Sequence, residues 1–158
     1  MPATPPAIEA AKAAAGGIPI VFPLGSDPVE TGLVASLEHP RGNITGLATM
    51  SWKQSRPRMA LVREAMPAIQ RVAQIHHSPN TALQLQVQAS RLAAEECAIE
   101  LVVLGYALLQ DLERTFESAG QNGAEALLPL SDPIASASAQ KIVALSLQYR
   151  IPVVSPFR

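Results

Sequence analysis

The chain has 158 residues, a formal net charge of -1, 48% hydrophobic residues and only 4% aromatic residues. This composition excludes a mostly disordered chain, and the near-neutral charge argues against a nucleic-acid binder, which needs a basic surface. The single cysteine, Cys97, excludes an internal disulfide and a zinc site built from several cysteines. No apolar run approaches the ~20 residues that a membrane-spanning helix needs.

Short apolar runs of β-prone residues alternate along the chain with longer amphipathic segments. The runs lack polar alternation, which is typical of parallel strands covered on both faces. The amphipathic segments carry apolar residues at helical spacing, which predicts helices that pack one face on a sheet. The sequence therefore predicts an α/β fold with doubly wound parallel sheets.

The predicted strands are residues 18–24, 71–76, 100–104, 126–130 and 151–154. A first helix is predicted over residues 6–15. The later helices are predicted to bury Met59, Val62, Met66 and Ile69; Leu85, Ala89, Leu92 and Ala93; Leu109, Leu112, Phe116 and Ala119; and Ile142, Leu145 and Tyr149.

A cluster of turn-forming residues, His39-Pro40-Arg41-Gly42-Asn43 followed by Gly46, interrupts this alternation. We interpret the cluster as a connection between two lobes, although an ordinary loop within one domain is the alternative. Residues 1–46 then belong to a first lobe and residues 47–150 to a second. Residues 151–158 begin a return to the first lobe.

A small polar residue followed by proline comes after several predicted strands. Such a residue accepts hydrogen bonds from the first N–H groups of a helix, and proline suits the first helical position. These helix starts share the carboxyl edge of a parallel sheet, where open α/β folds bind ligands and where N–H groups favour a carboxylate. Helix capping alone is the alternative for any one pair. The pairs are Thr4-Pro5, Asp27-Pro28, Ser78-Pro79, Asp132-Pro133 and Ser155-Pro156.

Candidate catalytic groups are few. His76 and His77 end one predicted strand, so their side chains point to opposite faces and are badly placed to share a metal ion. His77 beside Asp27 or Asp132 is a candidate general-base pair, but no nucleophile accompanies it. We therefore expect no catalytic residue, no metal and no cofactor.

Two other polar features have structural interpretations. Cys97 lies on an amphipathic helix, where we expect it to be buried and inert. Arg56, Arg58 and Arg63 flank another helix, where we expect a solvated face; a partner surface is the alternative.

Residues 18–47, IPIVFPLGSDPVETGLVASLEHPRGNITGL, resemble a segment of the ABC-transporter substrate-binding proteins of the periplasmic-binding-protein type I class. In that family an apolar strand leads into a GDPV-like turn, a GLVASL helix and a PGGN[VI]TG crossing. These are residues 25–29, 32–37 and 40–46 here, with Arg41 in place of a glycine. RVAQIHHSPNTA, ALLPLSDP and IPVVSPFR resemble later strands and loops of the family.

The resemblance implies a non-enzymatic protein that captures a small polar or amino-acid-like solute in a cleft between its lobes. An ABC permease is the implied partner. Together with the cap–proline pattern it implies ligand-binding residues at one sheet edge near the cleft. These residues are Thr4, Asp27, Ser78, Asn80 and Asp132, and the implied hinge residues are Gly46, Ser155 and Pro156.

Family members are about twice this length and begin with an export signal. We therefore expect the first lobe to be incomplete, and its uncovered strands to drive self-association. The resemblance implies a periplasmic or lipid-anchored location, whereas a genuine start at Met1 implies the cytoplasm, because MPATPPAIEAAKAAAGG is no signal peptide. The alternatives are a remnant that binds nothing and a doubly wound enzyme or regulatory domain using Asp27, His77 or Asp132.

Overall fold

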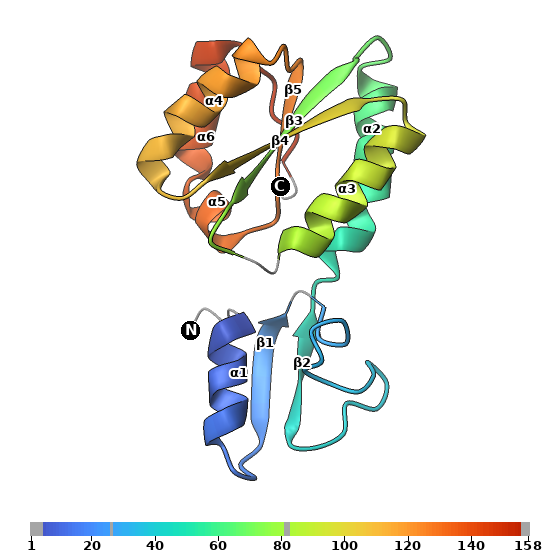
Figure 1. Cartoon of the computed structure of the whole chain (residues 1–158), viewed down its shortest axis with the longest axis vertical. Coiled ribbons are helices and arrows are strands. Elements are labelled where there is room, and N and C mark those ends of the chain that lie inside the picture. The colour runs from blue at the N-terminus through green and yellow to red at the C-terminus, as the bar shows by residue number, and fades with distance from the viewer. Residues whose placement is uncertain (1–4, 26, 81–82, 156–158) are drawn as a thin grey trace. The chain divides into compact units, whose positions relative to one another are not determined.

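The computed structural model describes residues 5–25, 27–80 and 83–155 (Figure 1). The chain divides into two compact units, unit 1 (Met1–Ser51) and unit 2 (Trp52–Arg158). Both units combine helices with parallel strands, which confirms the predicted α/β fold. No helix in the described part of the chain is long and apolar enough to cross a membrane.

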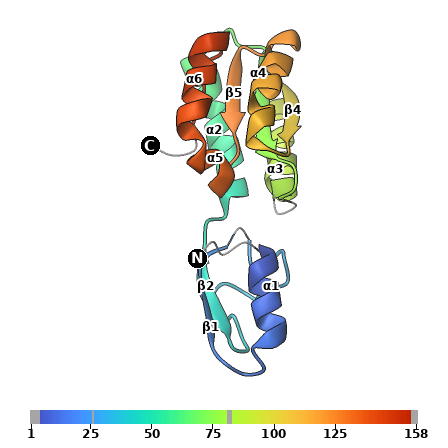
Figure 2. The same ribbon diagram turned by 90° about the vertical axis from the view of Figure 1, so that its left-hand side faces the viewer.

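Unit 1 contains one helix and two parallel strands, α1 (Pro5–Ala14), β1 (Ile20–Gly25) and β2 (Ile44–Ala48). The helix lies on one side of the strand pair (Figure 2). Its Ile8 packs in a buried cluster with Phe22 and Ile44, joined by two loop residues, Leu33 and Val34. Burial of these five side chains holds unit 1 together.

Strand β2 was not predicted, because residues 44–48 follow the turn formers without an apolar run of their own. The strand forms because it pairs with β1 in register, from Ile20 opposite Ile44 to Phe22 opposite Gly46. Gly46, expected at a hinge and at the end of the first lobe, therefore lies inside a paired strand. The two units divide after Ser51 instead.

The helix that the resemblance implied for residues 32–37 is also absent. A single turn forms, in which the Thr31 N–H donates to the Asp27 carbonyl oxygen at 3.1 Å. Gly32 then takes a φ of +70°, which ends the turn before a helix develops. The chain continues as bends that bury Leu33 and Val34.

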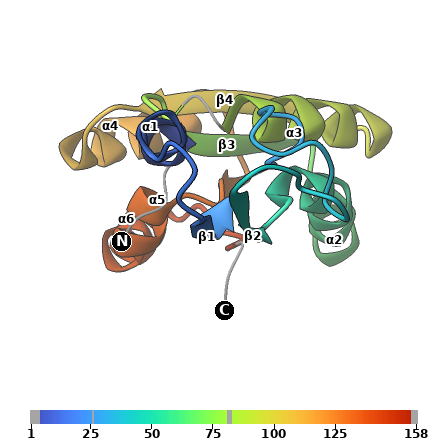
Figure 3. The ribbon, with the colours of Figure 1, turned by 90° about the horizontal axis from the view of Figure 1, so that it is seen from below.

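Unit 2 is a three-stranded parallel sheet in the order β4-β3-β5 with helices on both faces. Figure 3 shows α2 and α3 on one face and α4, α5 and α6 on the other. The strands are β3 (Arg71–His77), β4 (Glu100–Tyr106) and β5 (Ala126–Pro129). The helices are η1 (Ser51–Gln54), α2 (Ser55–Ala65), α3 (Gln84–Glu96), η3 (Leu109–Asp111), α4 (Leu112–Gln121), α5 (Pro133–Ala137) and α6 (Ala139–Tyr149).

The predicted apolar face of α4 is confirmed, since Leu112, Phe116 and Ala119 are fully buried, although Leu109 before it is exposed. Met59 and Val62 of α2 and Ile142 and Leu145 of α6 are buried as well, as predicted. The predicted face of α3 is only partly right: Ala93 is buried, but Leu92 is 63% exposed, and the other buried residues of the helix are Gln86, Val87, Ser90 and Ala94.

A polar contact explains the rotation of α3. Gln74 lies in the middle of β3 with 1% of its surface exposed, so its amide needs a partner inside the protein. Its Nε2 donates to Ser90 Oγ at 2.7 Å, and Ser90 Oγ in turn donates to Ser55 Oγ at 3.0 Å. The helix therefore turns Ser90 inward and leaves Leu92 on the surface.

The run at residues 151–154 forms one parallel bridge, Val153 with Leu127, instead of the predicted regular strand. Pro152 has no N–H to donate, which limits the pairing. Arg58 of α2 holds this segment, because its Nη2 donates to the carbonyl oxygens of Val154 at 3.1 Å and Pro129 at 3.2 Å. Arg58 is thus partly buried, contrary to the solvated face expected for it.

Candidate functional site

The carboxyl edge of the unit 2 sheet brings together the loops that follow β3 and β5 and the end of β4. The Ser78 N–H, just beyond β3, donates to the Tyr106 carbonyl oxygen at the end of β4 at 2.9 Å. Asn80 N–H donates to the His77 carbonyl oxygen at 3.0 Å, which folds the loop into a turn. These contacts place the side chains of the β3 loop at the sheet edge.

Asn80 and Asp132 meet at this edge, as the cap–proline pattern predicted. The Asn80 amide nitrogen donates to Asp132 Oδ2 at 2.7 Å. Asp132 Oδ1 accepts from the N–H groups of Ile134 at 2.7 Å and Ala135 at 3.4 Å, with Pro133 at the first helical position of α5. The predicted helix cap at Asp132 is therefore confirmed.

The Asp132 carboxylate is buried, and no cation of the described residues forms an ion pair with it. Only 3% of the residue is exposed. The ion pairs found among residues 5–25, 27–80 and 83–155 are Arg56–Glu96, Arg71–Glu100 and Asp111–Arg114, and none includes Asp132. Three N–H donors and the start of α5 stabilise this buried carboxylate, and a cationic group beside it would stabilise it further.

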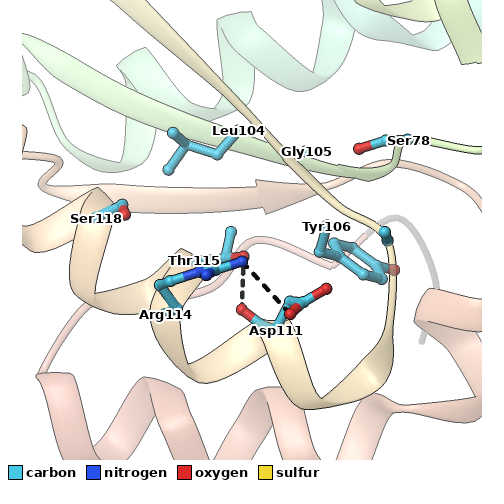
Figure 4. Close-up of a pocket in the computed structure, with 9 residues that line it drawn as sticks. Ser78, Leu104, Gly105, Tyr106, Asp111, Arg114, Thr115 and Ser118 are labelled. Carbon is cyan, nitrogen blue, oxygen red and sulfur yellow. Dashed lines mark hydrogen bonds and ion pairs between the residues drawn. The ribbon is translucent and has the colours of Figure 1, made fainter.

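Ser78 lies at the same edge, but its predicted capping role is wrong. Helix α3 begins at Gln84, and its first turn has no side-chain cap. The Ser78 hydroxyl instead approaches the backbone of Gly105, where an added Cβ would lie 2.2 Å from Ser78 Oγ. Figure 4 shows Ser78 close to Gly105 and Tyr106.

Tyr106 is a residue at this edge that the sequence analysis missed, because it ends an apolar strand and looks like a core residue. It is 1% exposed, and its hydroxyl has no hydrogen-bond partner within the described residues. Its ring packs on His77 with the ring centres 5.8 Å apart. Burial, followed by the negative charge of Asp132, raises the pKa of Tyr106 to about 12.

A hollow of about 240 Å³ lies at the end of β4 and the start of α4 (Figure 4). It is lined mainly by polar groups, among them Ser78, Asp111, Arg114 and Thr115. Arg114 pairs with Asp111 at 3.4 Å, and Thr115 Oγ1 donates to the Asp111 carbonyl oxygen at 2.9 Å. The polar groups of the hollow thus largely bond one another.

The two histidines at the end of β3, His76 and His77, have different surroundings. His77 packs on Tyr106 and brings Nε2 within 3.2 Å of the Ala107 carbonyl oxygen. Burial lowers the pKa of His76 below its usual 6.5. In the described part of the chain, no group of three or more His, Cys, Asp or Glu residues is placed to hold a metal ion. Cys97 is partly buried.

Asp27, the ligand-binding candidate of unit 1, is also buried, but it bonds a single turn and caps none of the helices that the structure describes. Its Oδ1 accepts from the N–H groups of Val29 and Glu30, each at 3.1 Å, and the residue is 6% exposed. Ser155 is exposed near the end of the described chain. Thr4 and Pro156 lie outside the described residues.

Comparisons with known proteins place the chain in a family. The family model described as ABC transporter substrate binding protein matches residues 2–156. A tyrosine-binding protein of Clostridioides difficile is 29% identical over 113 residues, which are 72% of this chain and 32% of that protein. These matches confirm the resemblance drawn from the sequence.

Solved structures share the fold. A conserved domain protein from Vibrio cholerae matches with a TM-score of 0.85 at 23% identity, over 96% of this chain and 50% of the other. An ABC domain from Streptococcus pneumoniae, in complex with L-Trp, matches with a TM-score of 0.81 at 17% identity, over 95% of this chain and 51% of the other. The chain thus spans about half the length of these solved proteins.

Proposed function

We propose, since the chain belongs to the family of ABC transporter substrate-binding proteins, that it binds a small solute bearing an ammonium group, of the amino-acid class. The observation that carries this proposal is the Asp132 carboxylate, which is buried at the carboxyl edge of the unit 2 sheet and pairs with no cation in the described part of the chain. A solute ammonium group would supply the missing positive charge. We propose no catalytic step and no bound metal.

The hydrogen bonds at Asp132 leave room for such a group. A carboxylate has about four acceptor positions. The two oxygens together already accept from Asn80, Ile134 and Ala135. A further donor, such as one N–H of an ammonium group, can therefore join without breaking the α5 cap.

The names of related proteins support the amino-acid class. The curated relative is a tyrosine-binding protein, and one structural neighbour was solved in complex with L-Trp. A more distant neighbour from Desulfitobacterium hafniense was solved in complex with Leu, with a TM-score of 0.57 at 16% identity. All three names refer to solutes with an α-ammonium group.

Titration calorimetry of the 158-residue chain with L-tyrosine, L-tryptophan and L-leucine tests this proposal. At least one should bind, and its corresponding deaminated acid should bind far more weakly. Asp132→Asn should abolish binding, because it removes the charge while keeping the shape. Glu125→Gln, which changes a carboxylate at the opposite edge of the sheet, is the control and should keep affinity. Equal binding by the acid and the amino acid would contradict the proposal.

We further propose, from the family, that the whole protein works outside the cytoplasm and delivers its solute to an ABC permease. Fractionation of host cells with an antibody against this chain tests the location. Recovery with the extracytoplasmic fraction is expected, and recovery with the cytoplasmic fraction would contradict it.

Self-association through unit 1 is the last part of the proposal. Val21 on β1 and Leu47 on β2 are 73% and 70% exposed, whereas parallel strands are normally covered on both faces. We propose that a second copy of the chain covers this apolar surface, because exposed strands of this kind recruit other chains.

A further inference from the structure

We infer that the Tyr106 hydroxyl is a second recognition group for the ammonium group of the solute, acting beside Asp132. This inference rests on the proposed function and identifies the ammonium group as the part of the solute that the site recognises. It makes Tyr106 a residue that determines specificity for a primary ammonium group.

The state of the hydroxyl is the first observation. Tyr106 is 1% exposed, and its hydroxyl has no partner among the residues that the structure describes. Buried hydroxyl groups are nearly always hydrogen-bonded, since an unmet bond destabilises the fold. Tyr149, the other tyrosine of the chain, is only partly buried and carries no such unmet bond. Binding of a solute would explain why the Tyr106 hydroxyl, which can both donate and accept a hydrogen bond, has no partner in the described residues.

The position of Tyr106 is the second observation. It is the last residue of β4, paired in register with His77 at the end of β3. Its side chain belongs to the same core cluster as Ala135 of α5, whose N–H is bonded to Asp132. The phenol therefore lies on the α5 side of the sheet, at the edge where Asp132 is held.

The chemistry of the phenol is the third observation. With its pKa raised to about 12, partly by the charge of Asp132, the group stays neutral at physiological pH. A neutral phenol oxygen accepts a hydrogen bond from an ammonium N–H, and the carboxylate supplies the opposite charge. A primary ammonium group has three N–H donors, so it can bond both groups at once.

Contact with the hydroxyl requires local movement, because the atom has no exposed surface. Residues 78–80, the turn directly after β3, bond both residues: the Ser78 N–H donates to the Tyr106 backbone carbonyl oxygen, and the Asn80 amide donates to the Asp132 carboxylate. A shift of residues 78–80 would let the solute reach the phenol oxygen and the carboxylate together.

This arrangement predicts how the protein treats methylated solutes. Each methyl group on the nitrogen removes one N–H donor while keeping the positive charge. An N,N-dimethyl amino acid has a single N–H, which the Asp132 carboxylate would take. A site that uses both groups therefore prefers the primary ammonium group, and the preference depends on Tyr106.

The test measures affinities of wild-type, Tyr106→Phe and Tyr149→Phe chains by titration calorimetry. The probes are L-tyrosine, L-tryptophan and L-leucine with their N,N-dimethyl derivatives. Tyr106→Phe should weaken binding of the primary amino acid about tenfold or more, the loss expected for one hydrogen bond from a charged donor. It should leave the dimethyl derivative within about twofold, and Tyr149→Phe should leave both unchanged. The melting temperature of Tyr106→Phe should equal or exceed that of the wild type, because no existing bond is lost.

Each other outcome overturns the inference. An unchanged affinity of Tyr106→Phe for the primary amino acid contradicts the contact, and an equal loss for both probes shows a structural effect only. Asp132→Asn separates the two proposals. If it loses binding while Tyr106→Phe does not, the proposed function stands without the Tyr106 contact. If Asp132→Asn keeps binding, or the wild type binds no probe, both fail.

Discussion

The Asn80 amide nitrogen donates a hydrogen bond of 2.7 Å to Asp132 Oδ2, across 52 positions of sequence. The bond joins the loop after β3 to the start of α5. The other oxygen of the same carboxylate caps α5 through the N–H groups of Ile134 and Ala135. One buried charge therefore fixes two loops of the sheet edge, and the position of Asn80 depends on Asp132.

The first prediction concerns this pair. Asn80→Ala should lower the free energy of unfolding by about 1–2 kcal/mol, since a buried carboxylate loses a donor. Asp132→Ala should cost more, because it also removes a helix cap that contributes about 1 kcal/mol. Urea unfolding of both single variants and the double variant measures the coupling between them. Strictly additive losses would show that the two side chains do not stabilise one another.

The second prediction concerns the close approach of β1 and β2. A Cβ at Gly46 would lie 2.2 Å from the Phe22 carbonyl oxygen, which is backbone and cannot rotate away. Gly46→Ala should therefore disrupt the strand pair and destabilise unit 1 by about 1–3 kcal/mol. Hydrogen exchange at residues 20–22 is the measurement. Gly17→Ala, where no atom lies within 4 Å of the added Cβ, is the control and should leave the exchange unchanged.

The third prediction concerns Arg63, which was expected on a solvated face and is instead partly buried. Its guanidinium donates to the carbonyl oxygens of Cys97 and Ala98 after α3 and of Pro67 and Ile69 after α2. Arg63→Ala should lower the free energy of unfolding by about 2–4 kcal/mol, because charge-assisted bonds at two helix ends are lost.

Two further variants make the Arg63 test specific. Arg63→Lys should recover only part of the loss, since an ammonium group cannot match the planar fork of a guanidinium. Arg91→Ala, at an exposed position of α3, should change little. Equal effects of Arg63→Ala and Arg91→Ala in urea unfolding would show that the five bonds do not stabilise unit 2.

The fourth prediction is a pH dependence. Burial lowers the pKa of His76 below 6.5, with a smaller opposing effect of the Leu104 backbone. The folded chain therefore favours the neutral imidazole. The stability from this preference is fully present above pH 6.5, where neither state binds the proton. It is lost as the pH falls from 6.5 through the lowered pKa, because the unfolded chain takes up the proton first.

Urea unfolding above and below pH 6.5 measures this effect. His76→Gln should flatten the decline in stability just below pH 6.5. Glu125 affects stability only at more acidic pH, because hydrogen bonds from the Gln70 and Arg71 N–H groups lower its pKa below 4.5. Its contribution is lost only as the pH falls through that lowered value. An unchanged decline in His76→Gln would show that His76 is not its source.

The fifth prediction concerns the exposed face of unit 1. Leu47→Asp should make the chain more monomeric in light scattering, because a charge replaces a side chain that is 70% exposed on the apolar face. Leu147→Asp, a change at a residue of α6 that is 75% exposed, is the matched control and should leave the mass unchanged. A monomeric wild-type chain would contradict the proposed self-association.

Much of the fold could be predicted from the sequence where hydrophobic periodicity decides the structure. The strands β4 and β5 are largely apolar runs, β3 is interrupted only by Gln74 at its centre, and α4 buries its predicted stripe of Leu112, Phe116 and Ala119. Strand β2 could not be predicted in this way, because residues 44–48 become a strand only by pairing with β1. The rotation of α3 likewise depends on the buried amide of Gln74, a contact between distant residues.

The candidate site could also be predicted only where local sequence decides the structure. Helix-cap chemistry placed Asp132 correctly, since an Asp-Pro pair has a local physical meaning. The Ser78-Pro79 pair looks the same in sequence, but α3 begins later, at Gln84. Tyr106 gave no signal, because its importance lies in a hydroxyl without a partner, which only the packed structure reveals.

Nuclear magnetic resonance of the labelled 158-residue chain, titrated with L-tyrosine, L-tryptophan or L-leucine, tests the central claim most directly. The account predicts that the bound amino acid shifts the Asn80 side-chain amide and the backbone amides of Ile134 and Ala135, which bond Asp132. The backbone amides of Gln70 and Arg71, which bond Glu125 at the opposite edge of the sheet, should keep their chemical shifts. Saturable shifts at Gln70 and Arg71 without shifts at Asn80, Ile134 and Ala135, or no shifts at all, would contradict it.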